Sequence, residues 1–319
     1  TLTFTNATIE ASDVSRFGWW ILQDGSSPMP VVNCSSVGLI TTWPLQATGL
    51  KSDDAVEVSC FDPLDSTACL QSALIGPASV VTIPARGGQP WITRPLRING
   101  SNREIILEPG CVIQAKRGEF HGSQDSLLLI AGATNITLRG RDRFPHPGRD
   151  FDAATVNLTS VPLLKMWKQD YASSNYSKAE WRMGIWVGEG TAGCGPTARR
   201  DRFPYGSCSP TSGIAISDIR VESSGGDGLY VENASNVSFL RVDSNDHYRQ
   251  GVSLIDVNGC HIANSSFRNT NGTSPSAGLD LEPSDPGQQM AGVEIENVLS
   301  ANNTGGGLSI NLGFIIGST

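Results

Sequence analysis

Carboxylate and arginine side chains recur beside a repeated glycine in the C-terminal half of the chain. Asp227 directly precedes one such glycine, and Arg249 stands two residues before the next. Asp280 and Glu282 follow the third glycine and lie two residues apart. Two carboxyl groups can divide the roles of general acid and general base in breaking a glycosidic bond. Together with His247, these residues form the candidate catalytic set.

Two kinds of bond cleavage fit these side chains, and the sequence leaves both open. In an inverting hydrolase, one carboxyl with a raised pKa protonates the leaving oxygen while a second carboxylate activates water. Asp227, Asp280 and Glu282 could divide those roles.

The other reaction is that of a lyase or epimerase acting on uronates, where a cation or an arginine neutralises the sugar carboxylate. His247, Tyr248 or Arg249 could then remove the C5 proton. No cofactor is certain from the sequence, although calcium held by carboxylate oxygens is compatible with such chemistry.

Aromatic side chains accompany the carboxylates. In each repeated segment Gly-a-x-b, the apolar residues a and b point inward, so residue x points outward with the period of a strand. The outward residues are Trp186, Tyr230, Ser253, Asp280 and Ser309. Because an aromatic face beside a carboxylate can hold a sugar ring, we expect the substrate-binding residues to be Trp186, Tyr230, Tyr248 and Arg182. The alternative for Trp186 is burial under a loop.

A second class of function explains the same charges without catalysis. An internal salt bridge between Asp227 and Arg249 would simply order the turns that carry them. Solenoids also serve as rigid surface proteins, adhesins or building blocks of extracellular assemblies with other partners. The two hypotheses differ in whether the candidate residues converge in one open groove.

The elements that must position these residues are five copies of the glycine segment. They span Met183–Val187, Asp227–Val231, Gln250–Leu254, Ala277–Leu281 and Gly306–Ile310. A repeat of this length on a short alternating strand is typical of a solenoid coil, which buries its apolar face only by stacking on neighbours. We therefore predict one inward stack, composed of Val187, Val231, Leu254, Leu281 and Ile310.

Two parts of the chain, residues 63–113 and 163–283, resemble a known superfamily. A short helix near 63–75 with Leu70, Ala73 and Leu74 on one face is followed by apolar strands at 79–84, 95–98 and 106–113. This order resembles the entry of pectate-lyase-like right-handed β-helix proteins, in which the helix caps the solenoid. Residues 163–283, including Gly278-Leu-Asp-Leu-Glu-Pro283, further resemble uncharacterised β-helix-repeat proteins of that superfamily.

The resemblance implies an all-β fold, a single-stranded right-handed parallel β-helix with a short N-terminal capping helix. We expect an irregular segment over 1–55 and the β-helix domain over 56–319. The last strand has no evident cap, so further sequence is expected beyond it. Two interruptions, at 140–152 and 189–211, are expected to be loops, either basic walls beside a groove or ordinary solvated loops.

Composition and charge limit the partners. The net charge is −8 and the pI is near 5.0, which argues against nucleic acid. A local arginine patch could still bind an anionic polysaccharide, so a polysaccharide or glycan is the expected partner. No apolar run approaches the roughly 18 residues of a membrane span.

Asparagine and cysteine usage indicates a secreted, extracellular glycoprotein. Eleven Asn-X-Ser/Thr sequences occur, and Asn175, Asn271 and Asn302 are the expected glycosylation sites. The alternative is that asparagine and threonine simply populate solenoid turns. Seven cysteines fit an oxidising compartment and are not spaced as a zinc site. Cys194 and Cys208 bracket an otherwise unordered loop and are expected to form a disulfide.

Overall fold

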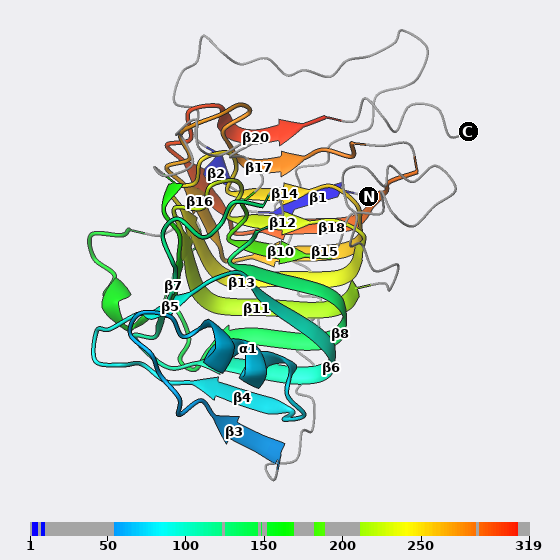
Figure 1. Cartoon of the computed structure of the whole chain (residues 1–319). Coiled ribbons are helices and arrows are strands. Elements are labelled where there is room, and N and C mark those ends of the chain that lie inside the picture. Colours follow the sequence, from blue (N-terminus) through cyan, green and yellow to red (C-terminus); the bar gives the residue numbers. More distant parts are fainter. Residues whose placement is uncertain are drawn as a thin grey trace, which may run out of the picture.

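The computed structural model describes residues 2–5, 8–9, 54–122, 125–145, 148, 152–168, 182–188, 211–284 and 287–311. In these ranges the chain forms a right-handed parallel β-helix, and every strand pairs in parallel with the strand of a neighbouring coil (Figure 1). The predicted fold class is confirmed. No described helix is long and apolar enough to cross a membrane.

The strands stack in three sheets, with β6, β8, β11 and β13 bending from one sheet into the next. The first sheet contains the N-terminal parts of β6 (Leu96–Leu107) and β8 (Leu128–Gly140), then β10 (Ile185–Val187), β12 (Leu229–Val231), β14 (Val252–Leu254), β17 (Ala277–Leu281) and β20 (Gly306–Ile310). We call it the glycine-segment sheet, because it holds the five repeated segments.

The other two sheets complete each coil. The second contains β3 (Ala55–Glu57), β4 (Val80–Ile83), the C-terminal parts of β6 and β8, the N-terminal parts of β11 (Thr211–Glu222) and β13 (Ala234–Asn245), then β15 (Val257–Ala263), β18 (Met290–Glu296) and β1 (Leu2–Thr5). The third contains β5 (Trp91–Thr93), β7 (Val112–Ala115), β9 (Leu163–Lys165), the C-terminal parts of β11 and β13, then β16 (Ser266–Arg268), β19 (Leu299–Ala301) and β2 (Thr8–Ile9). A short 3-10 helix, η3 (Leu158–Ser160), precedes β9.

The inward stack predicted from the glycine segments is present. Val187, Val231, Leu254 and Leu281 lie in register and are buried in the core, and Ile310 packs against it at the end of the stack. Burying each such side chain contributes about 1.5–3 kcal/mol, so the stack holds successive coils together.

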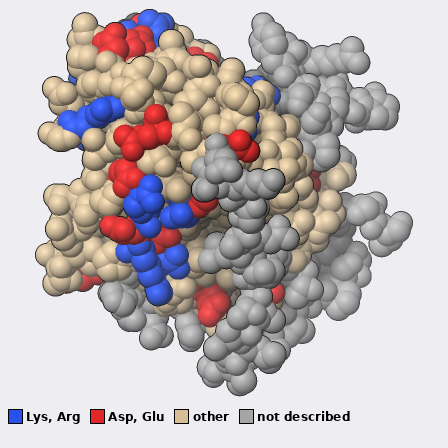
Figure 2. Space-filling model, turned by 90° about the horizontal axis from the view of Figure 1, so that it is seen from below, with Lys and Arg blue, Asp and Glu red and all other residues tan. Residues whose placement is uncertain are grey.

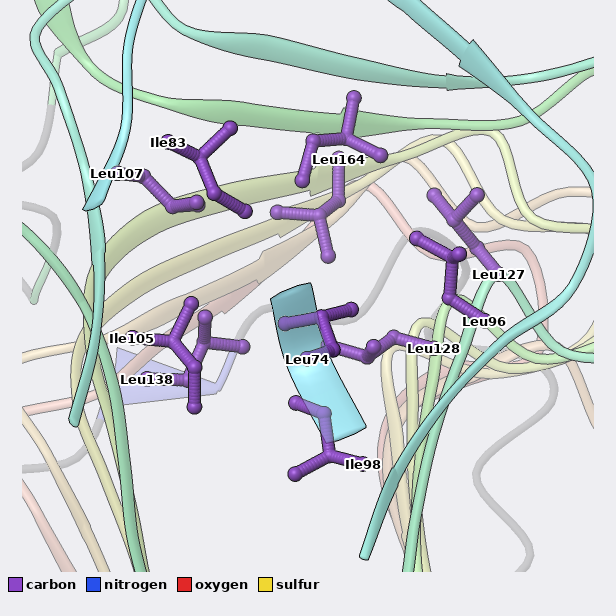
Figure 3. Close-up of a pocket in the computed structure, with 11 residues that line it drawn as sticks. Leu74, Ile83, Leu96, Ile98, Ile105, Leu107, Leu127, Leu128, Leu138 and Leu164 are labelled. Atoms are coloured by element: carbon purple, nitrogen blue, oxygen red, sulfur yellow. The ribbon is translucent and has the colours of Figure 1, made fainter. Parts of the chain in front are cut away.

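The helix α1 (Thr67–Ile75) covers the first coils, as expected. Leu70 and Leu74 are buried, and Leu74 projects into an apolar cavity of about 10 Å³ at this end of the core (Figure 3). The helix begins later than position 63, because the Asp62 carboxylate accepts the Leu64 N–H and closes a separate turn. It ends at Ile75 before Gly76, as predicted.

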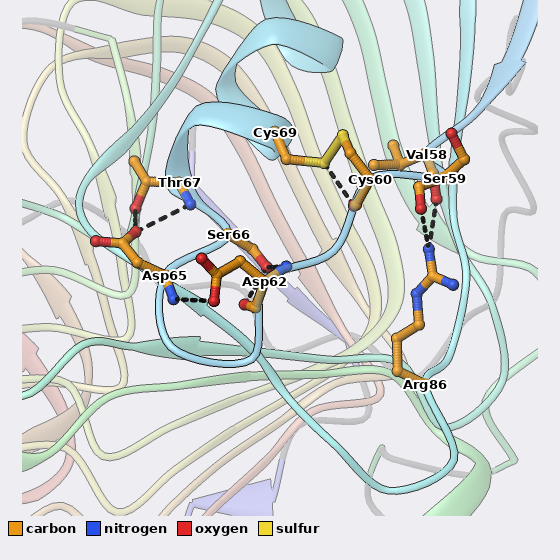
Figure 4. Close-up of a disulfide and its surroundings, with 9 residues drawn as sticks. All are labelled: Val58, Ser59, Cys60, Asp62, Asp65, Ser66, Thr67, Cys69 and Arg86. Carbon is orange, nitrogen blue, oxygen red and sulfur yellow. Dashed lines mark hydrogen bonds between the residues drawn. A yellow bond between two sulfur atoms is a disulfide. The ribbon is translucent and has the colours of Figure 1, made fainter.

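A disulfide between Cys60 and Cys69 ties α1 to the segment that precedes it (Figure 4). Among the described residues, Cys111 and Cys260 are free and buried. Cys194 and Cys208 lie outside the described residues, so their pairing stays a prediction. Beside the cap, Arg94 and Lys116 both pair with Asp65, at 3.0 and 2.8 Å. Figure 2, viewed from this end, shows basic side chains next to acidic ones.

The corners between sheets require left-handed backbone, and asparagine supplies much of it. One corner stacks six residues with positive φ, namely Asn102, Asn135, Gly213, Asn236, Gly259 and Gly292. Asparagine tolerates this conformation better than other residues with a Cβ. Five asparagines of the Asn-X-Ser/Thr sequences have positive φ, namely Asn135, Asn233, Asn236, Asn264 and Asn302. Part of the sequon density therefore has a structural origin.

The N-terminal residues differ from the irregular segment that we expected. Leu2–Thr5 and Thr8–Ile9 are strands, and they pair with β18 and β19 at the end of the solenoid opposite α1. Residues 10–53 lie outside the described residues, so the remainder of the predicted 1–55 segment stays a prediction.

Candidate functional site

The outward positions of the glycine-segment sheet form a ladder along the solenoid. Trp186, Tyr230, Ser253, Asp280 and Ser309 follow one another in register, as the glycine alignment predicted. Glu232 and Glu282 lie two residues after Tyr230 and Asp280, directly beyond the ends of β12 and β17, so Asp280 and Glu282 share one face.

Arg249 joins two carboxylates that are far apart in the sequence. Its Nη1 lies 3.3 Å from Asp227 Oδ2, and its Nη2 lies 3.2 Å from Glu282 Oε2. Ser253 Oγ donates to the same Asp227 oxygen at 2.7 Å. Hydrogen bonds between charged groups are stronger than neutral ones, so this arginine fixes the relative positions of the two acids.

Asp280 is held by a different side chain. Gln250 Nε2 donates to Asp280 Oδ2 at 2.5 Å, while Gln250 Oε1 accepts the Ala277 N–H at 2.9 Å. The second hydrogen bond fixes the orientation of the amide, because only its oxygen can accept from an N–H. Asp280 therefore receives a donor on Oδ2.

Asp227 and Asp280 each keep one oxygen without a hydrogen bond in the described part of the chain. Both Oδ1 atoms are buried, and Asp227 and Asp280 are 0% and 1% exposed. Buried carboxylate oxygens almost always have a partner, so two such atoms in one network call for an explanation. Each carboxyl thus has one anchored oxygen and one buried oxygen without a hydrogen bond.

Burial raises the pKa of both aspartates. The pKa of Asp227 rises to about 6 through burial, opposed by Arg249 and Ser253. The pKa of Asp280 rises to about 8 through burial and the nearby Glu282 carboxylate, opposed by the Ser309 hydroxyl and by Arg249. At neutral pH, Asp280 therefore carries a proton, whereas Asp227 is mainly ionised. Neighbouring carboxyls with separated pKa values are typical of acid–base pairs.

The aromatic pair beside the carboxylates is buried. The Trp186 and Tyr230 rings pack edge to face with centroids 4.9 Å apart, and together with Met183 and Ile255 they form a small outer cluster. Trp186 is 2% exposed and Tyr230 is 6% exposed. These rings do not form the open sugar platform that we expected, and burial was the alternative for Trp186.

The His247 ring bonds two serines and, in the contacts observed, none of the candidate carboxylates. Its Nδ1 accepts the Ser224 N–H at 3.2 Å, and its Nε2 lies 2.9 Å from Ser244 Oγ, which donates to the Gly251 carbonyl. Because the Ser244 hydroxyl hydrogen is used, Nε2 must carry the imidazole proton. The neutral ring is fully buried and orders the turn.

Arg182 and Tyr248, two of the expected substrate-binding residues, are also held by contacts within the protein. Arg182 is fully buried, and its Nε donates to the Phe120 carbonyl at 3.1 Å, so it is not available to a substrate in this structure. Tyr248 is partly buried and packs against the main core.

The described residues of the 140–152 interruption lie on the solenoid surface. Phe144 is buried with Val161 and Leu299, and its N–H donates to Asp218 at 2.8 Å. This contact favours a packed loop over a basic wall. The 189–211 interruption falls outside the described residues except for Thr211, which begins β11.

The carboxylates do not fit calcium. Arg249 occupies the space between Asp227 and Glu282, and a guanidinium and a cation would repel each other there. No group of three or more acidic, histidine or cysteine side chains that could hold a metal ion occurs in the described ranges.

Gln250 and Ser253 are the site residues that sequence reasoning missed. Both hold an aspartate by a side-chain hydrogen bond. Their register with Asp227 and Asp280 could have indicated this, because Ser253 lies between Tyr230 and Asp280 in the outward ladder.

Fold and site together define a parallel β-helix protein whose outer face holds a buried network of acids and one arginine. No protein-family model and no curated protein matches the chain.

Three solved structures match part of the chain. A provisionally assigned glycosyl hydrolase from Parabacteroides merdae matches at a TM-score of 0.45 and 11% identity, over 77% of this chain and 95% of its own. An iota-carrageenase complexed to iota-carrageenan fragments matches at 0.43 and 12%, over 72% and 48%. The iota-carrageenase from A. fortis matches at 0.37 and 14%, over 71% and 54%. The chain thus spans about half of each carrageenase, and similarity at this level does not indicate a reaction.

Proposed function

We propose that Asp227, Arg249, Asp280 and Glu282 form the active site of an enzyme that cleaves glycosidic bonds in a polysaccharide. The observation that supports this most is a set of three features that Asp227 and Asp280 have in common. Each is buried, has a raised pKa, and has one oxygen anchored and one without a partner. Strongly perturbed carboxyls that converge with an arginine are more frequent at active sites than elsewhere.

Hydrolysis fits these side chains better than elimination. The Gln250 amide donates to Asp280 Oδ2, so the carboxyl proton resides on Oδ1 and can pass to a leaving glycosidic oxygen. Asp227, ionised above its pKa of about 6, can take a proton from water through its own Oδ1. An eliminating enzyme needs a base for the C5 proton, and His247 is turned away into its own turn.

A panel of polysaccharides tests the proposal. Product should appear as new reducing ends without the ultraviolet absorbance of an unsaturated sugar. Ultraviolet-absorbing product would show elimination instead. No cleavage of any polysaccharide over a wide pH range would favour the second candidate.

The second candidate is a non-catalytic extracellular structural or adhesive glycoprotein. The burial of Asp227, Asp280, Trp186 and Tyr230 favours it, because a substrate must reach the unpartnered oxygens. In that case the network would only hold the turns in place. Its expected signature is a loss of stability on substitution with no activity to lose.

We further propose that the protein is secreted and glycosylated. The Cys60–Cys69 disulfide and the eleven sequons support this. Asn271 and Asn302 are exposed, and Asn302 Nδ2 donates to Asn269 at 2.6 Å, which leaves one N–H position for a glycan. Asn175 lies outside the described residues. A mass that glycosidase treatment of native material leaves unchanged would contradict glycosylation.

A further inference from the structure

The first residues of the chain repeat the sequence pattern of its last coils. Leu2-Thr-Phe-Thr-Asn-Ala-Thr-Ile9 matches Val293-Glu-Ile-Glu-Asn-Val-Leu-Ser300 and Cys260-His-Ile-Ala-Asn-Ser-Ser-Phe267. Each has apolar residues or cysteine at its first and third positions, two residues apart, and asparagine at its fifth. In the two later segments that asparagine occupies a left-handed corner between the second and third sheets. By sequence, residues 2–9 are therefore one further coil of the solenoid.

The structure stacks residues 2–5 and 8–9 of this segment on the far end of the solenoid. Leu2 lies opposite Val293 and Phe4 opposite Ile295, in parallel register with β18. The Asn297 N–H donates to the Thr5 carbonyl at 2.8 Å, which continues the ladder around the corner. Figure 1 shows β1 and β2, in dark blue, beside the strands of the C-terminal half.

The segment of residues 2–9 pairs with β18 and β19, but along the chain it connects to the opposite end of the solenoid. The next described strand, β3, lies at the opposite end of the second sheet, eight strand spacings or about 38 Å away. Residues 10–53 make the connection and could reach roughly 140 Å if fully extended. Neither β18 nor β19 is linked to β1 or β2 by a short turn, so an identical segment from another molecule can make the same pairs.

We propose that the edge formed by β18 and β19 is a strand-acceptor site whose partner is residues 2–9 of a second copy of this chain. At low concentration the chain's own segment fills the site, because a tethered segment has a higher effective concentration than the same segment of another molecule in dilute solution. As the protein concentration rises, exchange links copies through the same backbone pairs and the same inward Leu2 and Phe4. This surface does not depend on the proposed enzymatic activity.

A disulfide between different copies tests the exchange directly. Thr3 lies opposite Glu294 in neighbouring strands, so cysteines at these positions fall within disulfide range. Thr3→Cys and Glu294→Cys are prepared as separate proteins, one with a mass tag, then mixed and mildly oxidised. A disulfide that joins the two substituted positions can form only between copies. We expect this heterodimer to increase with protein concentration.

Two matched controls make every outcome informative. Glu57→Cys, on the exposed strand β3 at the opposite end, replaces Glu294→Cys in the mixture and measures chance collisions. The double variant Thr3→Cys/Glu294→Cys should cross-link within one chain at low concentration. Heterodimer no more abundant than with Glu57→Cys would overturn the proposed exchange. Failure of the double variant to cross-link would overturn the acceptor site itself.

Discussion

Gln250 and Asp280 lie on neighbouring coils, and the glutamine amide donates to Asp280 Oδ2 at 2.5 Å. The amide cannot turn round, because its oxygen accepts the Ala277 N–H. This hydrogen bond leaves Asp280 Oδ1 as the oxygen that can carry the carboxyl proton. Sequence alone gives the two residues different positions in their coils, and only the stacking of the coils joins them.

Replacing Gln250 should therefore affect both the fold and the reaction. Gln250→Leu leaves the buried Ala277 N–H without an acceptor and Asp280 Oδ2 without a donor. We expect a loss of about 1–3 kcal/mol in the free energy of unfolding, measured in urea. Gln250→Glu keeps an acceptor for the Ala277 N–H but replaces the donor to Asp280 with a carboxyl oxygen, so it should also lose stability, and less of it at low pH, where the new carboxyl is protonated. Equal stability in all three proteins would contradict the proposed anchoring.

The raised pKa of Asp280 makes stability fall as pH rises. A carboxyl with a folded pKa near 8 keeps a proton that the unfolded chain releases near its ordinary pKa of 3.8. Its contribution is thus complete below about pH 4 and is lost as pH rises towards 8. Asp280→Asn cannot ionise, so its stability relative to the unsubstituted protein should improve from pH 5 to pH 8. A constant difference would show that the pKa of Asp280 is not raised.

His247 has the opposite dependence. Burial, with the nearby Lys168, lowers the pKa of His247 to about 3, whereas the unfolded chain binds a proton near 6.5. Its contribution is complete above about pH 6.5 and is lost as pH falls towards 3. Two coils later, Asn303 occupies the position equivalent to that of His247, three residues after a serine. Its Nδ2 donates to Ser300 Oγ at 3.2 Å. His247→Asn should therefore fold and lose less stability on acidification, as urea unfolding at pH 7 and pH 4.5 would reveal.

The coil register could be predicted from sequence, whereas the environment of the site could not. Each glycine segment is local, so the ladder from Trp186 to Asp280 followed from its period. Whether Trp186 is covered depends on what packs against the outer face, and no local pattern reports that. The surroundings of His247 were not predicted, because its ring bonds Ser224 of the preceding coil as well as Ser244, and no local pattern indicates those contacts. The pairing of β1 with β18 joins opposite ends of the chain, so the pattern of residues 2–9 indicates a further coil but not the strand with which it pairs.

The disulfide predicted between Cys194 and Cys208 remains to be measured. Closing a loop of this size is worth about 3 kcal/mol on chain-entropy grounds. Non-reducing peptide mapping should recover Cys194 and Cys208 in one linked fragment. The Cys60–Cys69 pair should appear as a second, separate linked fragment. Recovery of Cys194 and Cys208 as free thiols would refute this pairing.

The most direct test of the proposed active site compares Asp280→Asn with Asp243→Asn. Asp243 is also buried and paired with an arginine, Arg268, at 2.9 Å, but it lies at a different corner of the coil. Asp280→Asn should abolish polysaccharide cleavage and should not lower the free energy of unfolding near pH 7, because asparagine, unlike Asp280, releases no proton when the chain unfolds. Asp243→Asn should lose stability and keep its activity per folded molecule. If Asp280→Asn instead loses several kcal/mol, or cleaves as well as the unsubstituted protein, the network is structural and the proposed active site is wrong.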